Sequence, residues 1–354
     1  MKFVDVKAEY NFYKAEIDAA VSRVLSSGQY FFGKELEKLE KNMAGPSGKS
    51  WGVGVKNATD GLQLILQYLW KPGTKIILPN FGAYPTAVAA RNVTRTGAYI
   101  QYVDVDRSMT IDPNKLPDSF CGSKAILLAV NLFGNDCDFQ KLATWALGKK
   151  VTLVVDRAQS AGSASEPWGA YSVYSFYPTK PLASMGDGGM ITGNDPAAEK
   201  YLRQARFYGQ DGRKKVVQAG VNSRMDEIQA AIVNVKFDTF QVMTSIRESI
   251  AARYLEIVQG ITWRAGAAYH LFPVLFNNRE KVIAEMEKRK IPYIINYEEH
   301  VNEMKQLNGC GLAHPGYRIN DKILSIPCHA FMKENEIQKV EEFLNDVKGY
   351  EATE

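Results

Sequence analysis

Cysteine and histidine are scarce in this chain, which has 354 residues but only four of each. The cysteines contain no C-x-x-C pair, and the histidines have none of the spacings typical of metal ligands. These residues are Cys121, Cys137, Cys310 and Cys328, and His270, His300, His314 and His329. The sequence therefore argues against a disulfide framework and against a metal site, and it predicts free thiols in a reducing compartment.

Long apolar runs and blocks of positive charge are also missing. No uninterrupted apolar stretch reaches the length of a membrane span, and the N-terminus lacks the apolar core of a signal peptide. The net charge of +4 is mild, and no block rich in Lys and Arg with interleaved aromatic residues is present. We therefore expect a cytoplasmic protein with no membrane and no nucleic-acid partner, whose charge is compatible with a small polyanionic ligand.

Apolar patterning predicts an α/β fold. With 45% apolar residues the chain can bury a large core, and two domains are expected, at residues 1–245 and 246–354. Strands are expected at 51–55, 75–78, 99–105, 125–130, 151–155, 171–176 and 189–192, and helices at 13–25, 34–43, 60–70, 84–92, 138–147 and 196–207. This alternation is typical of a mostly parallel sheet with helices on both faces.

The second domain is predicted to be smaller. Residues 221–259 contain no proline or glycine and predict long helical structure that leads into it. The remainder has apolar runs near 271–276, 291–297 and 322–327 and ends in an amphipathic helix near 334–348, a pattern typical of a small α+β domain.

Lys180 is the most informative residue in the sequence. It ends the segment YSFYPTK at 174–180, shortly before the glycine-rich GDGG at 186–189. An amine must lose its proton to act as a nucleophile, and burial beside apolar neighbours lowers the pKa of a lysine toward that state. Phe176 and Leu182 could supply such surroundings. A lysine that closely follows a proline is, however, more often a solvated loop residue.

Asp156 is a matching carboxylate. It ends the apolar run 151–155, which predicts a buried parallel strand, and α/β proteins bind ligands at the carboxyl ends of such strands. A buried carboxylate can keep the ring nitrogen of pyridoxal phosphate (PLP) protonated, so that the ring withdraws electrons from a substrate carbanion. An aspartate that ends a strand is often only a helix cap. The lysine and the aspartate together are typical of a PLP site.

Residues 53–61 predict a turn that binds the phosphate. Thr59 is expected to cap a helix whose apolar residues between 62 and 69 have helical spacing, and a helix start attracts phosphate. A threonine cap on a core helix also occurs without a ligand. A dinucleotide fingerprint beginning at Gly52 fails, because the third glycine of G-x-G-x-x-G would fall at Asn57.

Taken together and in this order, the motifs resemble the DegT/DnrJ/EryC1/StrS family of PLP-dependent nucleotide-sugar aminotransferases over nearly the whole chain. They are SGQYFFGKE at 27–35, NATDGL at 57–62, VDRAQS at 155–160, SFYPTK at 175–180, GVNSRMDEIQAA at 220–231 and LSIP at 324–327. The resemblance implies PLP-dependent transferase fold type I, with a mostly parallel seven-stranded sheet and a small α+β C-terminal domain.

The resemblance also implies roles for single residues around the cofactor ring. Lys180 would hold PLP covalently and, once released, would carry protons to and from the substrate carbon. Asp156 would pair with the pyridine nitrogen. Gln159 would donate a hydrogen bond to the ring oxygen.

The phosphate group has its own implied partners. Thr59, the Ala58 backbone and Ser175 would bind it within one subunit. In this family the asparagine that matches Asn222 reaches the phosphate from a neighbouring subunit, so a homodimer with shared active sites is expected. A helix cap is the alternative structural reading of Asn222.

The implied reaction is a two-stage amino transfer, in which L-glutamate leaves its amine on PLP and a nucleotide-linked ketosugar receives it. The motifs are most similar to the branch that aminates carbon 3, so we expect a 3-keto-6-deoxyhexose carried on dTDP, with carbon 4 as the alternative. Substrate contacts are expected from Gln29, Tyr30, Tyr84, Arg213, Lys214, Asn296 and Tyr297.

Several positions depart from the family pattern. Ala58 replaces a glycine, which requires a negative φ at that residue. Ala83 stands where an aromatic ring normally stacks on the cofactor, and Tyr84 or Phe81 could substitute for it. The loop 209–219 carries a cluster of positive charge that is either solvated or in contact with a pyrophosphate.

These departures leave other functions open. A PLP-binding or regulatory protein without turnover is one alternative, because of Ala83. A nicotinamide-dependent sugar oxidoreductase is another. A PLP-dependent dehydratase of the same family is disfavoured, since such proteins carry histidine where Lys180 stands.

Overall fold

The computed structural model describes residues 1–95, 99–119, 124–163, 168–307 and 319–352. Within these ranges Cys137 and Cys328 are free and buried, whereas Cys121, Cys310 and His314 lie outside the described residues. No helix in the described part of the chain is long and apolar enough to cross a bilayer.

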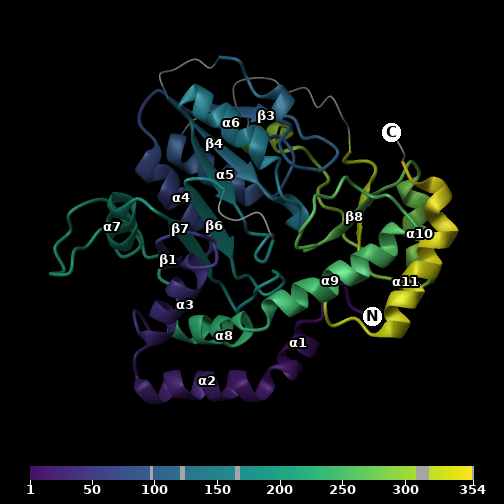
Figure 1. The fold of residues 1–354 in the computed structure, drawn as a ribbon, viewed down its shortest axis with the longest axis horizontal. Helices are drawn as coiled ribbons and strands as arrows, with labels where there is room; N and C mark the ends of the chain where they lie inside the picture. Colours follow the sequence, from purple (N-terminus) through teal and green to yellow (C-terminus); the bar gives the residue numbers. More distant parts are fainter. Residues whose placement is uncertain (96–98, 120–123, 164–167, 308–318, 353–354) are drawn as a thin grey trace.

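A seven-stranded sheet forms the centre of the larger part of the molecule (Figure 1). Its strands are β1 (Trp51–Val55), β2 (Thr74–Pro79), β3 (Ile100–Val103), β4 (Lys124–Val130), β5 (Thr152–Asp156), β6 (Tyr171–Ser175) and β7 (Gly189–Gly193). Their order is β1-β7-β6-β5-β4-β2-β3. Among these described strands, the pairs of β7 with β1 and with β6 are antiparallel and the other pairs are parallel. The predicted mostly parallel, seven-stranded sheet is confirmed.

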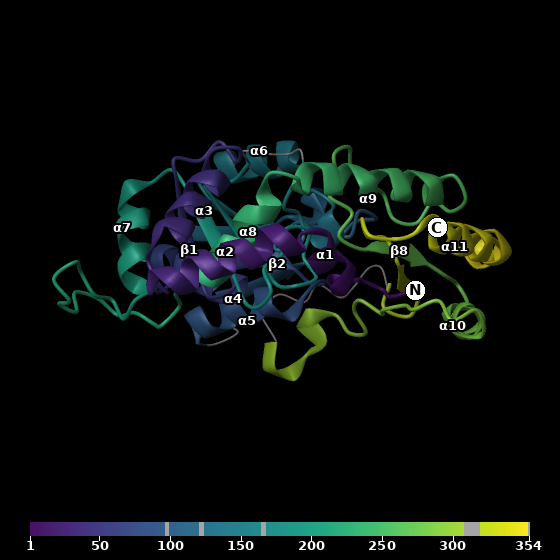
Figure 2. The ribbon, with the colours of Figure 1, turned by 90° about the horizontal axis from the view of Figure 1, so that it is seen from below.

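Helices cover both faces of this sheet, as Figure 2 shows with the sheet between α5 and α6. One face packs against α4 (Ala58–Leu69), α5 (Tyr84–Thr94) and α7 (Pro196–Ala205), and the other against α6 (Phe139–Lys149), α3 (Lys34–Ala44) and α8 (Glu227–Phe237). Side chains alternate between the two cores along each strand: Leu128 and Val154 face α4 and α5, whereas Leu127 and Val155 face α6. Burial on both faces explains the continuous apolar runs in the sequence.

A second, smaller core lies around an antiparallel pair of strands. The pair is β8 (Phe272–Leu275) and β9 (Ile323–Ile326), and α9 (Phe240–Leu255), α10 (Arg279–Lys288) and α11 (Glu334–Val347) pack around it. In Figure 1 the long helix α9 runs from the larger part of the molecule toward this smaller part. The predicted domain boundary between residues 245 and 246 falls inside α9 and remains a prediction.

Two features differ from the expected elements. The stretch 221–259 is not continuous helix, because residues 221–226 are extended and α8 and α9 are separate helices. The helices α1 (Val6–Phe12) and α10 were not predicted. The first predicted helix, 13–25, corresponds to α2 (Lys14–Ser27).

Candidate active site

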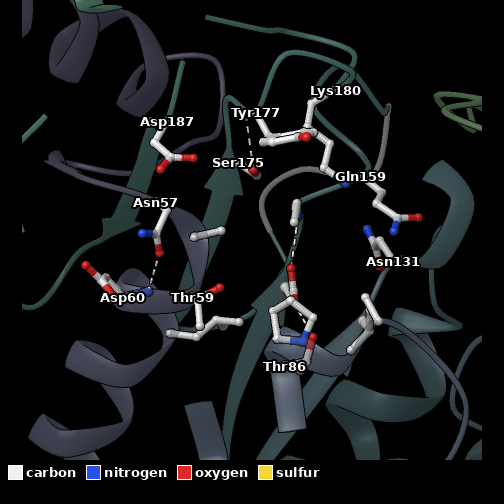
Figure 3. Close-up of a pocket in the computed structure, with 18 residues that line it drawn as sticks. Asn57, Thr59, Asp60, Thr86, Asn131, Gln159, Ser175, Tyr177, Lys180 and Asp187 are labelled. Atoms are coloured by element: carbon white, nitrogen blue, oxygen red, sulfur yellow. Dashed lines mark hydrogen bonds between the residues drawn. The ribbon is translucent and has the colours of Figure 1, made fainter. Parts of the chain in front are cut away.

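A cavity of about 490 Å³ opens at the carboxyl ends of β4, β5 and β6. We call it the first cavity (Figure 3). Its wall is formed by the starts of α4 and α5, the ends of these strands, and the loop after β6. Most of the predicted cofactor residues line it, namely Ala58, Thr59, Asp156, Gln159, Ser175 and Lys180. Parallel strands bring their carboxyl ends to one edge of the sheet, which explains why residues far apart in sequence meet here.

Asp156 is buried at the end of β5. Its Oδ2 accepts a hydrogen bond from the hydroxyl of Thr86 at 2.6 Å, and its Oδ1 accepts one from the backbone N–H of Ala158 at 3.0 Å. Burial raises the pKa of the Asp156 carboxyl, while these hydrogen bonds and the charge of Lys180 act in the opposite direction. The carboxylate therefore accepts hydrogen bonds from two neutral donors and is attracted by the positive charge of Lys180.

Sequence reasoning missed Thr86. The residue lies in the first turn of α5, behind Pro85, and its side chain is buried. A threonine after a proline at a helix start looks like an ordinary capping signal, so only the packing of α5 against the end of β5 reveals its contact with Asp156.

Lys180 lies in a loop that is fixed at both ends. Its own N–H bonds the carbonyl of Tyr177 at 2.8 Å, and both the N–H and the hydroxyl of Ser184 bond the carbonyl of Phe176 at 2.7 Å. Arg247 of α9 donates to the carbonyl of Pro181 at 3.1 Å. Lys180 lines the first cavity and is half-buried as a whole. Desolvation of its amine lowers the pKa of Lys180 to about 8, against the opposing effect of Asp156. The pKa of the amine is thus shifted in the expected direction, while Phe176 and Leu182 pack in the core with α3 and α8.

The start of α4 forms the phosphate end of the first cavity. Asn57, not Thr59, caps this helix, because the Asn57 side chain accepts from the N–H of Asp60 at 2.8 Å. The cap prediction was wrong by two positions, which leaves the Thr59 hydroxyl available in the first turn. Ala58 has the negative φ that replacement of glycine requires. A Cβ at Gly189 would lie 2.6 Å from the Asn57 backbone, so glycine there allows α4 to approach the sheet.

Gln159 is held in one orientation. Its Oε1 accepts from the backbone N–H of Phe133 at 2.6 Å, and its Nε2 donates to the hydroxyl of Tyr297 at 3.3 Å. Because an amide nitrogen carries two protons, one donor remains for an acceptor in the first cavity. Tyr297 is a predicted substrate contact. Its hydroxyl is linked to the first cavity by the hydrogen bond from Gln159, which lines that cavity.

In the described part of the chain, neither Phe81 nor Tyr84 enters the wall of the first cavity in place of the ring missing at Ala83. Ala83 lines the first cavity, and Tyr177 is the only aromatic residue among the described residues of its wall. Phe81 is fully buried and packs against Tyr297, with ring centroids 5.9 Å apart. Tyr84 is exposed and also packs on Tyr297, at 5.7 Å. The alanine therefore leaves the wall open on this side.

A second cavity of about 340 Å³ adjoins the first, and Asp187 lines both. It contains the predicted phosphate residue Asn222, together with Lys56, Arg224, Asp226, Gln229 and Phe31. Asn222 is exposed and does not cap a helix, since α8 is capped by Asp226. Within one chain Asn222 thus lines the second cavity, whereas Ala58, Thr59 and Ser175 line the first.

The other predicted substrate residues are not gathered at the first cavity. Gln29, Tyr30, Arg213 and Lys214 are exposed and line neither cavity, and Asn296 lies beside Tyr297. Their roles remain predictions. In the described ranges no three His, Cys, Asp or Glu side chains come together as a metal site would require.

A model of the DegT/DnrJ/EryC1/StrS aminotransferase family matches residues 12–345. The chain belongs to this family. It is 31% identical to the Pseudomonas aeruginosa UDP-2-acetamido-2-deoxy-3-oxo-D-glucuronate aminotransferase, over 94% of this chain and 96% of that one. It is also 31% identical to the Streptomyces venezuelae dTDP-3-amino-3,4,6-trideoxy-alpha-D-glucose transaminase, over 83% and 81%. The crystal structure of a DegT DnrJ EryC1 StrS aminotransferase from Brucella abortus has a TM-score of 0.90 at 27% identity, with 99% of this chain and 100% of that chain covered.

As a member of the DegT/DnrJ/EryC1/StrS family, the protein is a PLP-dependent sugar aminotransferase of fold type I. The first cavity fits PLP by its own chemistry. It offers a desolvated amine at Lys180, a buried carboxylate at Asp156, and the positive end of α4 with the hydroxyls of Thr59 and Ser175.

Proposed function

We propose that this enzyme moves the amino group of L-glutamate to carbon 3 of a 3-keto-6-deoxyhexose carried on dTDP. The proposal depends chiefly on one observation, that the Lys180 amine and the Asp156 carboxyl lie in the wall of a single cavity with their pKa values shifted by burial. The name of the Streptomyces relative, with its amino group on carbon 3 of a dTDP-linked deoxy sugar, supports the choice of acceptor.

The residues of the first cavity have separate roles in the proposed reaction. Bound PLP supplies a ring that stabilises negative charge on the carbon next to the transferred nitrogen. Asp156 keeps the ring nitrogen protonated, and the free N–H of Gln159 holds the ring oxygen. Because its pKa is lowered to about 8, the Lys180 amine loses its proton more readily than an ordinary lysine, and it would move the proton to and from the substrate carbon.

The phosphate of the cofactor is proposed to lie at the start of α4. Backbone N–H groups of the first turn and the hydroxyl of Thr59 face the cavity from one side, and Ser175 faces it from the end of β6. The Ser175 hydroxyl already accepts from the N–H of Tyr177 at 3.3 Å, which leaves its proton free to donate to a phosphate oxygen.

The exposed residues are proposed to complete the site in a homodimer. Asn222 would reach the phosphate of the partner subunit, since it is exposed and lines the second cavity and not the first. Gln29, Tyr30, Tyr84, Arg213, Lys214, Asn296 and Tyr297 would contact the sugar nucleotide. Positive charge at 213–214 suits a pyrophosphate.

Mixed dimers test the shared site. Lys180→Ala and Asn222→Ala each remove one residue, and we expect both pure variants to be impaired. When the two variants are unfolded together and refolded, a mixed dimer has one site with Lys180 from one subunit and Asn222 from the other. Recovery of amino transfer above the sum of the pure variants supports sharing, whereas no recovery in a refolded, PLP-loaded mixture contradicts it.

A product assay tests the reaction and its position. Purified protein is supplied with L-glutamate and, in separate reactions, with 3-keto and 4-keto sugars on dTDP, UDP and GDP. We expect the fastest turnover with the dTDP-linked 3-keto sugar. A preference for 4-keto sugars would reassign the position. A PLP-loaded protein whose visible spectrum is unchanged by glutamate would contradict transamination and would favour a binding protein without turnover.

A further inference from the structure

We propose that Thr86 is a positioning residue, whose hydroxyl keeps Asp156 ionised and aimed at the ring nitrogen of PLP. This inference rests on the proposed function, because it assumes that Asp156 pairs with that nitrogen. No motif pointed to Thr86, which becomes visible only where α5 meets the end of β5.

The hydrogen bond between Thr86 and Asp156 is short and buried. Thr86 Oγ1 lies 2.6 Å from Asp156 Oδ2, and both residues are 4% exposed. An ionised carboxylate only accepts hydrogen bonds, so the Thr86 hydroxyl must be the donor. A hydrogen bond from a neutral group to a charged one is short and strong in such surroundings.

The donor is neutral, which matters for the role of Asp156. Thr86 occupies one lone pair of Oδ2, and the N–H of Ala158 occupies one of Oδ1 at 3.0 Å. Each carboxylate oxygen has a further lone pair, so the carboxylate can still accept from a protonated ring nitrogen. An arginine or lysine in place of Thr86 would neutralise the charge that the nitrogen needs.

The position of Thr86 on its helix adds to this effect. It lies in the first turn of α5, an 11-residue helix, so the Asp156 carboxylate contacts the positive end of that helix. The titratable groups that act on Asp156 from other elements are Lys180, in the loop after β6, and Tyr297, in the segment after α10. The neighbouring Arg157 guanidinium donates instead to the hydroxyl of Ser163.

Three variants separate this role from a general effect on packing. Thr86→Val removes the hydroxyl at nearly constant volume, and Thr86→Ser keeps it. Thr94→Val is a matched control, because Thr94 is on the same helix, is also 4% exposed, and its hydroxyl donates to the Ala90 carbonyl, away from the cavity. Circular dichroism and thermal unfolding establish that each apoprotein is folded.

The first measurement is the equilibrium dissociation constant of PLP from each apoprotein. We expect Thr86→Val to bind PLP roughly tenfold more weakly, which corresponds to one unit of pKa at Asp156. Thr86→Ser should restore affinity to within about twofold of the wild type, since its hydroxyl can make the same bond. Equal affinities for Thr86→Val and Thr94→Val would overturn the proposal.

The second measurement is the same constant from pH 5 to pH 8. The hydrogen bond from Thr86 lowers the pKa of Asp156. Without this hydrogen bond, Asp156 takes up a proton at higher pH. Once protonated, Asp156 no longer attracts a protonated ring nitrogen. As pH falls, the affinity for PLP should therefore begin to decrease at a pH roughly one unit higher in Thr86→Val than in the wild type, and Thr94→Val should show no such shift. Parallel curves for these two variants would overturn the proposal.

Failure of this inference is distinct from failure of the proposed function. If wild-type protein binds PLP and transaminates while Thr86→Val behaves like Thr94→Val, only the role of Thr86 is lost. If wild-type protein neither binds PLP nor reacts with glutamate, the proposed function itself is lost, and the role of Thr86 is lost with it.

Discussion

The two cavities that meet at Asp187 differ in how complete they are. The first has a buried carboxylate, Asp156, in its wall, and the Asp156 carboxyl and the desolvated Lys180 amine interact within one chain. The second is lined largely by exposed charged residues, such as Lys56 and Asp226, and by Asn222, whose proposed partner lies outside the chain. The buried carboxylate and the desolvated amine are thus brought together within one chain, whereas the residues proposed to contact the acceptor and the partner's phosphate are exposed.

The aromatic and basic side chains around the second cavity sharpen this contrast. The Arg224 guanidinium lies 4.0 Å from the Phe31 ring centroid and 5.0 Å from that of Phe207, so its position is fixed by ring contacts. Lys56, by contrast, projects from an exposed position. Exposed charges are well solvated. Single substitutions at the second cavity should therefore lower the rate of amino transfer less than substitutions at the buried carboxylate do.

The largest effect is expected at the amine of the first cavity. Lys180→Ala should lower the rate of amino transfer roughly a thousandfold or more, because it removes the group that is proposed to hold PLP and to move the proton. The rate of product formation from glutamate and the best keto sugar measures it. Lys200→Ala, an exposed change on α7, serves as the control. Substantial activity in folded Lys180→Ala would remove this residue from its role.

Two carboxylates of the first cavity provide the next comparison. Asp156→Asn removes a buried charge, and the rate of amino transfer should fall roughly a hundredfold. Asp187→Asn removes an exposed charge from the same cavity, and its rate should stay within about tenfold of the wild type. Steady-state kinetics with both variants measures the difference. Equal losses would show that burial does not distinguish the two groups.

The stability of the apoprotein should report the burial of Lys180. Its folded pKa of about 8 lies below the unfolded value, so between about pH 8 and pH 10.5 the unfolded chain binds more protons and the folded state gains stability as pH rises. Lys180→Met has no such group. The stability advantage of Lys180→Met should therefore be largest below pH 8 and shrink by at most about 3 kcal/mol toward pH 10.5.

Urea unfolding of both apoproteins across this pH range provides the measurement. Lys200→Met is the matched control, because an exposed lysine keeps its ordinary titration. A constant difference between wild type and Lys180→Met would mean that the Lys180 amine is solvated, and the contrast between the two cavities would then fail at its central residue.

The smallest expected effect is a gain. Ala83→Phe places a ring where the wall of the first cavity is open, and stacking on the cofactor should lower the dissociation constant of PLP by about threefold to tenfold. Ala83→Leu adds bulk without a ring face and should give less. If Ala83→Phe weakens PLP binding, the space beside Ala83 is needed by another group.

Much of the fold followed from patterning alone. All seven strands were predicted to within about two residues, since buried parallel strands are continuous β-branched and apolar runs bounded by turns, and β5 with Asp156 at its end is the clearest case. The helix after β1 was also predicted, but its cap was not: asparagine and threonine both cap helices, and the choice of Asn57 depends on how closely α4 approaches Gly189.

The sequence by itself determined the chemistry of this protein, because a lysine, an aspartate and a phosphate turn in ordered motifs are local signals that the chain carries in its residue types. Only the tertiary structure decided which side chains surround them. Thr86 reaches Asp156 across 70 residues, Gln159 is oriented by Phe133 and Tyr297, and Asn222 lies in a separate cavity. Such contacts form between elements distant along the chain, so packing of helices against the sheet fixes them and local pattern does not.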